Sequence, residues 1–326
     1  MNKKLLIAIL VVIIVVVGGF FLFHKPTTPA QNERASITIA TPRIVSALLP
    51  VAASQHIFEK HGLNVTLVTT QTGDEAVKAM LGNSADVALV GTAPYAFLAL
   101  DQQNKKIFAT IAAGHDQQIV ARKDHGITKP ADLKGKKIGY TKGSTSELGL
   151  DKFLAGNGLK VEDIKLVNLK PAAMQTALIA GDIDAYSGWE PVVSSGIKSL
   201  GENAIAFDEA PYFSWLVHLA ADESYIRDHK DTLEKLLAAL KETEQFTSTN
   251  KDTAIAATAS FINVPADTVT NIWPKYDFQV SVTPDLTQTL QANLTWANDQ
   301  RATKVQTMPD PNTLIDRSIF EYASTH

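Results

Sequence analysis

The sequence of 326 residues contains no cysteine. This absence excludes structural disulfides, thiolate metal sites, cysteine nucleophiles and lipid anchors attached through cysteine. The chain also lacks the glycine-rich phosphate loops of nucleotide-binding proteins and the GxSxG motif of serine hydrolases. Its histidines show no HExxH spacing. We therefore expect no catalytic residue, no metal site and no cofactor.

Outside the N-terminus, basic residues are outnumbered by acidic ones. Residues 1–25 hold three lysines and no acidic residue, so residues 26–326 carry a net charge of −7. No basic stripe interleaves with aromatic side chains, and we expect no nucleic-acid partner. The hydrophobic content of 45% and charged content of 20% are typical of a folded globular protein. The length is sufficient for two domains.

The N-terminus predicts a membrane segment. Lys3 and Lys4 precede an uncharged apolar run at residues 5–23. As a helix this run is about 28 Å long, close to the ~30 Å of a bilayer's hydrocarbon core. We expect a transmembrane anchor within residues 1–25, with a signal cleaved after Ala30 as the alternative. Both interpretations place the remainder outside the cytoplasmic membrane.

After a polar linker at residues 26–35, strand and helix patterns alternate. Strands are predicted at residues 36–41, 63–68, 86–90, 136–140, 165–168, 184–187 and 214–221, and helices at 44–60, 74–81, 144–156 and 172–180. This alternation predicts a mainly parallel sheet covered on both faces. Further helices are predicted at residues 231–247, 252–261, 266–276, 284–299 and 312–322. Residues 79–95 resemble residues 177–192, a weak repeat that indicates two lobes built on one plan.

The predicted fold class is α/β, with two α/β lobes and a hinge after the N-terminal membrane helix. The first lobe comprises residues 36–121, the second lobe residues 122–216, and residues 217–326 complete the first lobe with a helical C-terminal part. Residues 118–122 and 215–221 are expected to cross between the lobes. Such extended crossings permit hinge closure, and ligands in α/β sheets bind at the carboxyl ends of the strands.

Four segments resemble the type II periplasmic binding proteins of the nitrate/sulfonate/taurine group, which includes binders of thiamine-precursor pyrimidines. They are HIFEKHGLNVTLV, NSADVALVGTAPY, ADLKGKKIGYTKGSTSELGLDKFLAGNGL and ALIAGDIDAYSGWEP, beginning at His56, Asn83, Ala131 and Ala177. The resemblance spans about residues 36–300. It implies an extracytoplasmic solute-binding component of an ABC importer whose partners are a permease and its ATPase. The expected membrane anchor departs from the group, which often has a cleaved signal or a lipid-modified cysteine.

The strongest candidate site is the segment Gly143, Ser144, Thr145 and Ser146, which follows a strand and opens a helix. Its free backbone N–H groups and the helix dipole favour an anion. Ser144 and Glu147 also match a capping box, in which these groups satisfy one another. The resemblance places this segment in the cleft and favours ligand contact.

Thr41 and Arg43 lie at the end of the first strand, and Thr92 follows the third. A guanidinium at a strand end can bind an oxyanion through two hydrogen bonds, although Arg43 fits an exposed helix start equally well. Thr92 is either a ligand contact or a helix cap.

Trp189 and Glu190 follow the matching strand of the second lobe. Trp189 fits either contact with an apolar ligand body or core packing, and Glu190 fits either ligand binding or hinge contacts. Asp86 and Asp184, which begin apolar strands, are interpreted as structural.

The leading hypothesis is capture of a small organic, sulfonate-like anion between two closing lobes. A thiamine-precursor pyrimidine or an aromatic acid fits nearly as well. A membrane-anchored sensory module is a further alternative. An enzyme ranks below these, because the related pyrimidine synthases carry a cysteine-rich motif that this chain lacks.

Overall fold

The computed structural model describes residues 34–44, 46–101 and 104–325. The predicted membrane segment at residues 5–23 lies outside these ranges. Among the described helices, none has the length and apolar character needed to span a bilayer. The described residues from Ala35 onward form one compact unit.

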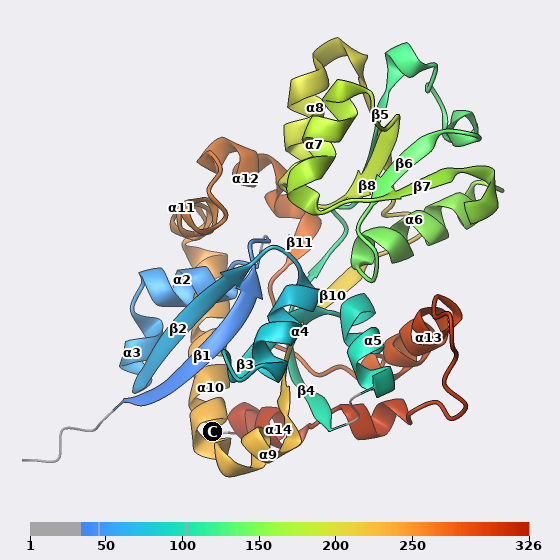
Figure 1. The fold of residues 1–326 in the computed structure, drawn as a ribbon. Coiled ribbons are helices and arrows are strands. Elements are labelled where there is room, and N and C mark those ends of the chain that lie inside the picture. Colours follow the sequence, from blue (N-terminus) through green and yellow to red (C-terminus); the bar gives the residue numbers. More distant parts are fainter. Residues whose placement is uncertain (1–33, 45, 102–103, 326) are drawn as a thin grey trace, which may run out of the picture. The chain divides into compact units, whose positions relative to one another are not determined.

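The first sheet has the strand order β11-β4-β10-β3-β1-β2 (Figure 1). Its strands are β1 (Ala35–Pro42), β2 (Leu63–Thr70), β3 (Val87–Gly91), β4 (Lys105–Gly114), β10 (Trp215–Asp222) and β11 (Tyr276–Asp277). Strand β1 is parallel to β2 and β3, whereas β10 is antiparallel to β3 and β4. The prediction of a mainly parallel sheet is therefore wrong. The sheet is mixed because β10 returns from the second sheet and inserts antiparallel between β3 and β4.

The second sheet has the order β7-β6-β8-β5-β9. Its strands are β5 (Gln118–Arg122), β6 (Lys137–Tyr140), β7 (Lys165–Asn168), β8 (Ala185–Gly188) and β9 (Ala204–Asp208). Strand β6 is parallel to β7 and β8, and β5 is antiparallel to β8 and β9. Apart from β11, the two orders correspond strand for strand, with β10 of the first sheet in the place of β5.

Two aspartates mark this correspondence. Asp86 precedes β3, and its carboxylate accepts a hydrogen bond from the backbone N–H of Thr38 in β1 at 2.7 Å. Asp184 precedes β8, and its carboxylate accepts one from the N–H of Lys137 at 2.8 Å, where β6 begins. These contacts agree with the structural role predicted for both residues and support the predicted repeat.

The chain passes between the sheets at residues 115–117 and again at residues 209–214. The segments expected to cross, residues 118–122 and 215–221, instead form strands β5 and β10 within the sheets. Each crossing lies just before the segment predicted for it.

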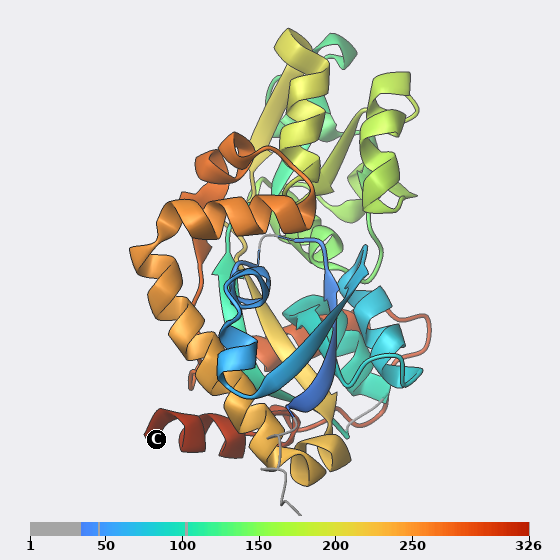
Figure 2. The same ribbon diagram turned by 90° about the vertical axis from the view of Figure 1, so that its left-hand side faces the viewer.

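Helices cover both sheets. They are α2 (Leu48–Ser54), α3 (Ile57–Lys60), α4 (Gly73–Leu81), α5 (Thr92–Asp101), α6 (Thr145–Gly156), α7 (Pro171–Ala180), α8 (Val192–Leu200), α9 (Glu223–Asp228), α10 (Lys230–Thr249), α11 (Lys251–Ile262), α12 (Ala266–Ile272), α13 (Leu286–Asp299) and α14 (Ser318–Thr325). Helix α10 packs on α2, α3 and α14, and α13 packs on α5 (Figure 2). Short 3₁₀ turns lie at Lys123–His125, Pro130–Leu133, Val161–Asp163, Gly201–Asn203, Trp273–Lys275 and Pro311–Leu314.

Three predicted helices are interrupted. The helix expected at residues 312–322 is a 3₁₀ turn at Pro311–Leu314 followed by α14, which begins at Ser318. The helix expected at residues 44–60 is divided into α2 and α3 by His56, which has a left-handed backbone with φ of 56°. The helix expected at residues 266–276 ends at Ile272. Pro274 follows it, and proline lacks the N–H group that would continue the hydrogen-bond pattern. The chain then forms the short strand β11.

The two faces of the first sheet have separate cores. Ile37, Ile39 and Leu89 pack on one face, whereas Ala40 and Val90 pack on the other. This division follows from the period of two along a strand, which sends successive side chains to opposite faces. Helices cover both faces, as predicted.

Candidate functional site

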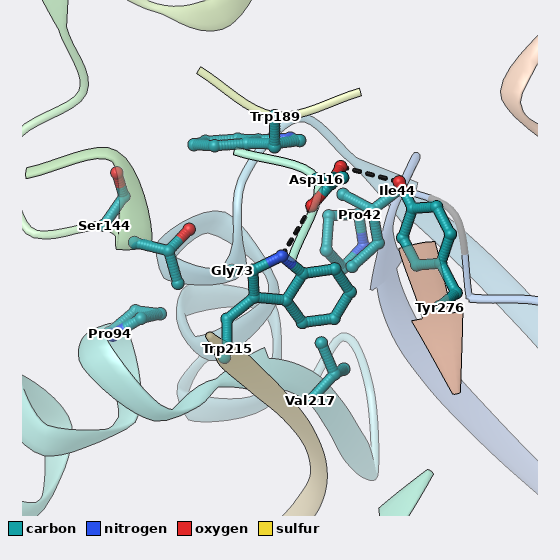
Figure 3. Close-up of a pocket in the computed structure, with 12 residues that line it drawn as sticks. Pro42, Ile44, Gly73, Pro94, Asp116, Ser144, Trp189, Trp215, Val217 and Tyr276 are labelled. Atoms are coloured by element: carbon teal, nitrogen blue, oxygen red, sulfur yellow. Dashed lines mark hydrogen bonds between the residues drawn. The ribbon is translucent and has the colours of Figure 1, made fainter. Parts of the chain in front are cut away.

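A small cavity of about 50 Å³ opens to solvent where the chain passes between the sheets. Its lining comes from the first sheet and its helices, from the second sheet and from the crossing segment. The residues are Pro42, Ile44, Gly73, Gly91, Pro94, Asp116, Ser144, Thr145, Trp189, Trp215, Val217 and Tyr276 (Figure 3). Most of these side chains are apolar or aromatic. Among the described lining residues there is no lysine, arginine or histidine.

Asp116, in the first crossing segment, joins three elements around the cavity. Its side chain is 1% exposed. Oδ1 accepts a hydrogen bond from the indole Nε1 of Trp215 at 2.6 Å. Oδ2 accepts one from the hydroxyl of Tyr276 at 2.6 Å and one from the backbone N–H of Glu190 at 2.9 Å. Trp215 begins β10, Tyr276 lies in β11 and Glu190 follows β8, so one carboxylate connects both sheets.

Close packing around Trp215 requires a glycine. A Cβ atom on Gly114, at the end of β4, would lie 2.3 Å from Cζ2 of Trp215. Without that atom, the indole packs against Gly114, and its N–H donates to Asp116. The rings of Trp215 and Tyr276 meet edge to face, with centroids 5.8 Å apart.

The N-terminus of helix α6 supplies the polar end of the cavity. The Ser144 hydroxyl accepts a hydrogen bond from the Ser146 N–H at 3.1 Å, and Glu147 accepts one from the Gly143 N–H at 2.6 Å. This arrangement resembles the predicted capping box, but Glu147 reaches Gly143 rather than Ser144. Within the part of the chain that the structure describes, the N–H groups of Ser144 and Thr145 have no acceptor.

The two sheets approach closely at this end. A Cβ atom on Gly91, at the end of β3, would lie 3.3 Å from Cγ2 of Thr145. The absence of a side chain at Gly91 therefore keeps the cavity open beside α6. Farther along α6, the carboxylate of Asp151 accepts a hydrogen bond from the indole of Trp296 in α13 at 2.8 Å. Helix α6 thus contacts the first-sheet part of the chain both at its N-terminus and farther along, at Asp151.

Two buried carboxyl groups, those of Glu190 and Glu209, lie near Asp116. Burial raises the pKa of Glu190, although the backbone N–H and hydroxyl of Ser194 both donate to its carboxylate. Burial also raises the pKa of Glu209, to about 8. Burial, with the nearby charge of Asp116, raises the pKa of Tyr276 well above its usual value. The Tyr276 hydroxyl therefore stays protonated and donates to Asp116.

The residues predicted from the sequence fall into two groups. Ser144, Thr145 and Trp189 line the cavity. The others do not: Thr41, Arg43, Thr92, Gly143, Ser146 and Glu190 lie outside the described lining. Arg43 is exposed at the end of β1.

The buried members of the second group have partners within the fold. The Thr92 hydroxyl lies 2.8 Å from Nε2 of His218. The Ser146 hydroxyl donates to the carbonyl of Ser187 at 2.9 Å, and Glu190 accepts from Ser194 at the start of α8. These contacts account for their burial without a ligand.

Sequence reasoning missed Asp116, Trp215 and Tyr276. Asp116 lies two residues before the segment 118–122 that was expected to cross between the lobes, and a charged residue at that place was the available signal. Its partners lie 99 and 160 residues away in the sequence, and no local pattern connects them. No group of three histidine, aspartate or glutamate residues that could hold a metal ion occurs among the described residues.

Comparison with known proteins places the chain in a family. The model of the NMT1/THI5-like family matches residues 44–254. The chain belongs to this family. Among its relatives is a putative binding protein of Brucella abortus, 25% identical over 225 residues, which cover 67% of this chain and 68% of the relative. The putative aliphatic sulfonates-binding protein of Escherichia coli is 26% identical over 234 residues, covering 67% of this chain and 69% of the relative.

Solved structures of similar fold agree with the family assignment. The periplasmic aliphatic sulphonate binding protein SsuA from Escherichia coli matches with a TM-score of 0.75 and 21% identity, covering 86% of this chain and 97% of that one. The family member described here therefore has the periplasmic binding protein fold, a mixed α/β architecture with two sheets. The desulfurization enzyme DSZB matches with a TM-score of 0.65 and 14% identity, covering 90% and 99%. The fold alone thus does not distinguish binding from catalysis.

Proposed function

We propose that this chain is the solute-binding component of an ABC importer and works outside the cytoplasmic membrane. Its ligand is a small organic anion with a sulfonate-like head group. The observation that carries this proposal is the cavity lined from both sheets at the two crossings. The sulfonate-binding names of relatives support the ligand class. A permease, its ATPase and an N-terminal membrane anchor complete the proposed system.

The proposed lobes follow the two sheets. The first lobe holds residues 35–114 and 215–326, and the second holds residues 118–208. These boundaries differ from those predicted from the sequence by a few residues, because each crossing precedes its expected place. A ligand that contacts both lobes stabilises the closed arrangement, and a permease can then distinguish loaded from empty protein.

In the proposed complex the anionic head binds the N–H groups of Ser144 and Thr145. These groups lack acceptors, and the positive end of the α6 dipole adds to their attraction for an anion. Trp189 and Trp215 enclose the organic body of the ligand. Arg43, exposed beside the lining residues Pro42 and Ile44, is proposed to attract anions toward the mouth.

The aromatic lining favours a second candidate ligand. Trp189, Trp215 and Tyr276 offer ring faces and edges, and no cationic side chain occurs among the described lining residues. A planar ring such as an aminopyrimidine fits this lining through stacking. Transport of that ligand would leave the proposed role unchanged and alter only the solute.

A binding function is favoured over an enzymatic one. The relatives named above are binding proteins, and the chain has no cysteine to act as a nucleophile. A membrane-anchored sensory module with the same cavity is the remaining alternative. The two alternatives differ in the partner protein. Co-purification with a permease would support the importer component over the sensory module.

The test is a thermal-shift screen on the full chain, purified in mild detergent because residues 5–23 are apolar. The panel contains alkanesulfonates, taurine, nitrate, aminopyrimidines and aromatic acids. A ligand at about 100 times its Kd stabilises the folded state by about 2.7 kcal/mol. We expect sulfonates to raise the melting temperature. A well-folded sample that responds to none of these compounds would contradict the proposal.

One substitution tests the proposed anion contact. Thr145 is the first residue of α6, and Ser144 before it has an extended backbone with φ of −117° and ψ of 177°. Proline is compatible with both features, so Thr145→Pro removes one N–H donor and leaves the helix intact. Thr145→Ala, the control, keeps that donor. We expect only the proline variant to weaken sulfonate binding, by roughly 10-fold.

A further inference from the structure

The two sides of the cavity differ in chemistry. Figure 3 shows Ser144 and Asp116 on opposite sides, with Trp189 above and Trp215 below the space between them. The Ser144 side presents N–H donors that lack acceptors. The Asp116 side presents a carboxylate. A ligand that spans the cavity therefore meets donors at one end and an acceptor at the other.

Asp116 retains capacity for one more hydrogen bond. An ionised carboxylate has about four lone-pair sites, two on each oxygen. Oδ2 accepts from Tyr276 and from the Glu190 N–H, which fills both of its sites. Among the described residues, Trp215 alone donates to Oδ1. The remaining site is on Oδ1, in a residue that lines the cavity.

No side chain of opposite charge accompanies Asp116 in the cavity. Lysine, arginine and histidine are absent from the described lining. The positive charge of Lys275 lowers the pKa of Glu190, but Lys275 does not line the cavity. The other acidic groups near Asp116 are Glu190 and Glu209, which add no positive charge. A ligand with only an anionic group would bring a second negative charge to this space.

We propose that the ligand also carries an amino group, and that this group donates a hydrogen bond to Oδ1 of Asp116. Asp116 is then the residue that selects ligands with an amino group over analogues that have a methyl group in its place. This inference rests on the proposed function, because the anionic head at Ser144 and Thr145 sets the direction of the ligand. The amino group belongs either to an aminoalkanesulfonate or to an amino-substituted ring, and both offer an N–H donor.

The bonds to Asp116 fix the position of this acceptor. Trp215 and Tyr276 hold the carboxylate from the first lobe, and the Glu190 N–H holds it from the second. Trp189, which covers the cavity, precedes Glu190 in the chain. The hydrogen bond from the Glu190 N–H therefore keeps Trp189 close to Asp116. An amino group bound to Oδ1 of Asp116 would lie near both side chains.

The experiment is calorimetric titration of the full chain with two compounds of equal length. Taurine, 2-aminoethanesulfonate, ends in an ammonium group, and propane-1-sulfonate has a methyl group in its place. A hydrogen bond to a charged group predicts that taurine binds roughly 10- to 100-fold more tightly. The pair 4-aminopyrimidine and 4-methylpyrimidine tests the same contact with a ring.

Two variants separate recognition from folding. Asp116→Asn keeps an acceptor for Trp215 but removes the charge, and we expect the preference for the amino compound to fall to less than about 3-fold. Asp86→Asn, which changes a carboxylate outside the described lining, is the control, and the preference should persist in it even if the protein is less stable. Melting curves verify that each variant is folded.

The outcomes distinguish this inference from the proposed function. Equal affinity for taurine and propane-1-sulfonate would overturn the role of Asp116 and leave sulfonate binding intact. A preference for 4-aminopyrimidine that Asp116→Asn abolishes, with no sulfonate binding, would support Asp116 and overturn the sulfonate head group. Failure of all four compounds to bind at about 1 mM would contradict both.

Discussion

Asp86 and Asp184 make the same contact in the two sheets. Asp86 precedes β3 and Asp184 precedes β8, and each accepts a hydrogen bond from a backbone N–H of the neighbouring parallel strand, at 2.7 and 2.8 Å. The backbone reinforces both, because the N–H of Asp86 donates to the Thr38 carbonyl and that of Asp184 to the Lys137 carbonyl. Asp184 additionally contacts Nδ1 of His125 at 2.6 Å. These contacts fix the register of β1 with β3 and of β6 with β8.

Replacement of Asp86 tests the structural value of this contact. Asp86→Ala leaves the Thr38 N–H without its carboxylate acceptor, and we expect the free energy of unfolding to fall by about 1–3 kcal/mol. Asp86→Asn retains one acceptor oxygen and should lose less. Urea denaturation measures both changes. An alanine variant as stable as the wild type would show that the contact does not contribute.

A buried histidine predicts loss of stability in mild acid. His218 is fully buried between the hydroxyls of Thr92 and Thr110, and burial lowers its pKa from 6.5 to about 3. The unfolded chain binds a proton below about pH 6.5, whereas the folded chain does not. This contribution is thus present above pH 6.5 and declines by up to about 1.4 kcal/mol per pH unit below it.

His218→Gln removes this titration. Urea denaturation at pH 7 and pH 5 should show a smaller loss in the variant than in the wild type. Equal losses in the two proteins would mean that His218 is protonated in the folded state.

A buried glutamate predicts the opposite pH dependence of stability, between about pH 4.5 and pH 8. Burial raises the pKa of Glu209 from 4.5 to about 8, although Ser187 donates a hydrogen bond to its carboxyl at 2.8 Å. The folded state binds a proton that the unfolded state has released. This contribution is therefore complete below pH 4.5 and declines as the pH rises toward 8, by up to about 1.4 kcal/mol per pH unit.

Glu209→Gln preserves the size of the side chain and removes its ionisation. The variant should gain stability relative to the wild type between pH 5 and pH 8. Glu202→Gln, at an exposed position, serves as the control and should show no such gain. A Glu209→Gln variant with the same pH dependence as the wild type would contradict the prediction.

Trp189 is expected to contribute to ligand affinity more than to stability. It lines the cavity and is partly exposed. Trp189→Ala should therefore raise the Kd of a bound solute roughly 10- to 100-fold through lost apolar and ring contacts. Trp273→Ala is the matched control, because Trp273 is also partly exposed but packs on Phe278 outside the cavity. Fluorescence titration compares them, and equal effects on the Kd would exclude Trp189 from the site.

The sequence predicted those elements that depend on residues close together in the chain. Strands β1 and β2, the α6 cap at Ser144 and the structural role of Asp86 follow from periodicity and nearby residues. The break at His56 did not, because a left-handed histidine leaves no mark on the apolar pattern. The mixed sheet was missed because β10 pairs with strands more than 100 residues earlier in the chain.

The candidate site shows the same limit. Ser144, Thr145 and Trp189 follow strands at positions where α/β folds place ligands. Thr92 occupies a similar position, yet its hydroxyl meets His218, which lies 126 residues away. Asp116 acquires its role from Trp215 and Tyr276, and only the folded structure brings these three residues together.

The most direct test of the account is calorimetric titration of the wild type and of Gly91→Val with the sulfonate that gives the largest thermal shift. Gly91 lines the cavity, and its added side chain would meet Thr145 and Pro94. If solute binds between the sheets, the wild type binds one equivalent and the variant, while still folded, loses at least about 10-fold in affinity. Unchanged affinity in a folded Gly91→Val variant would contradict the placement of the site in this cavity.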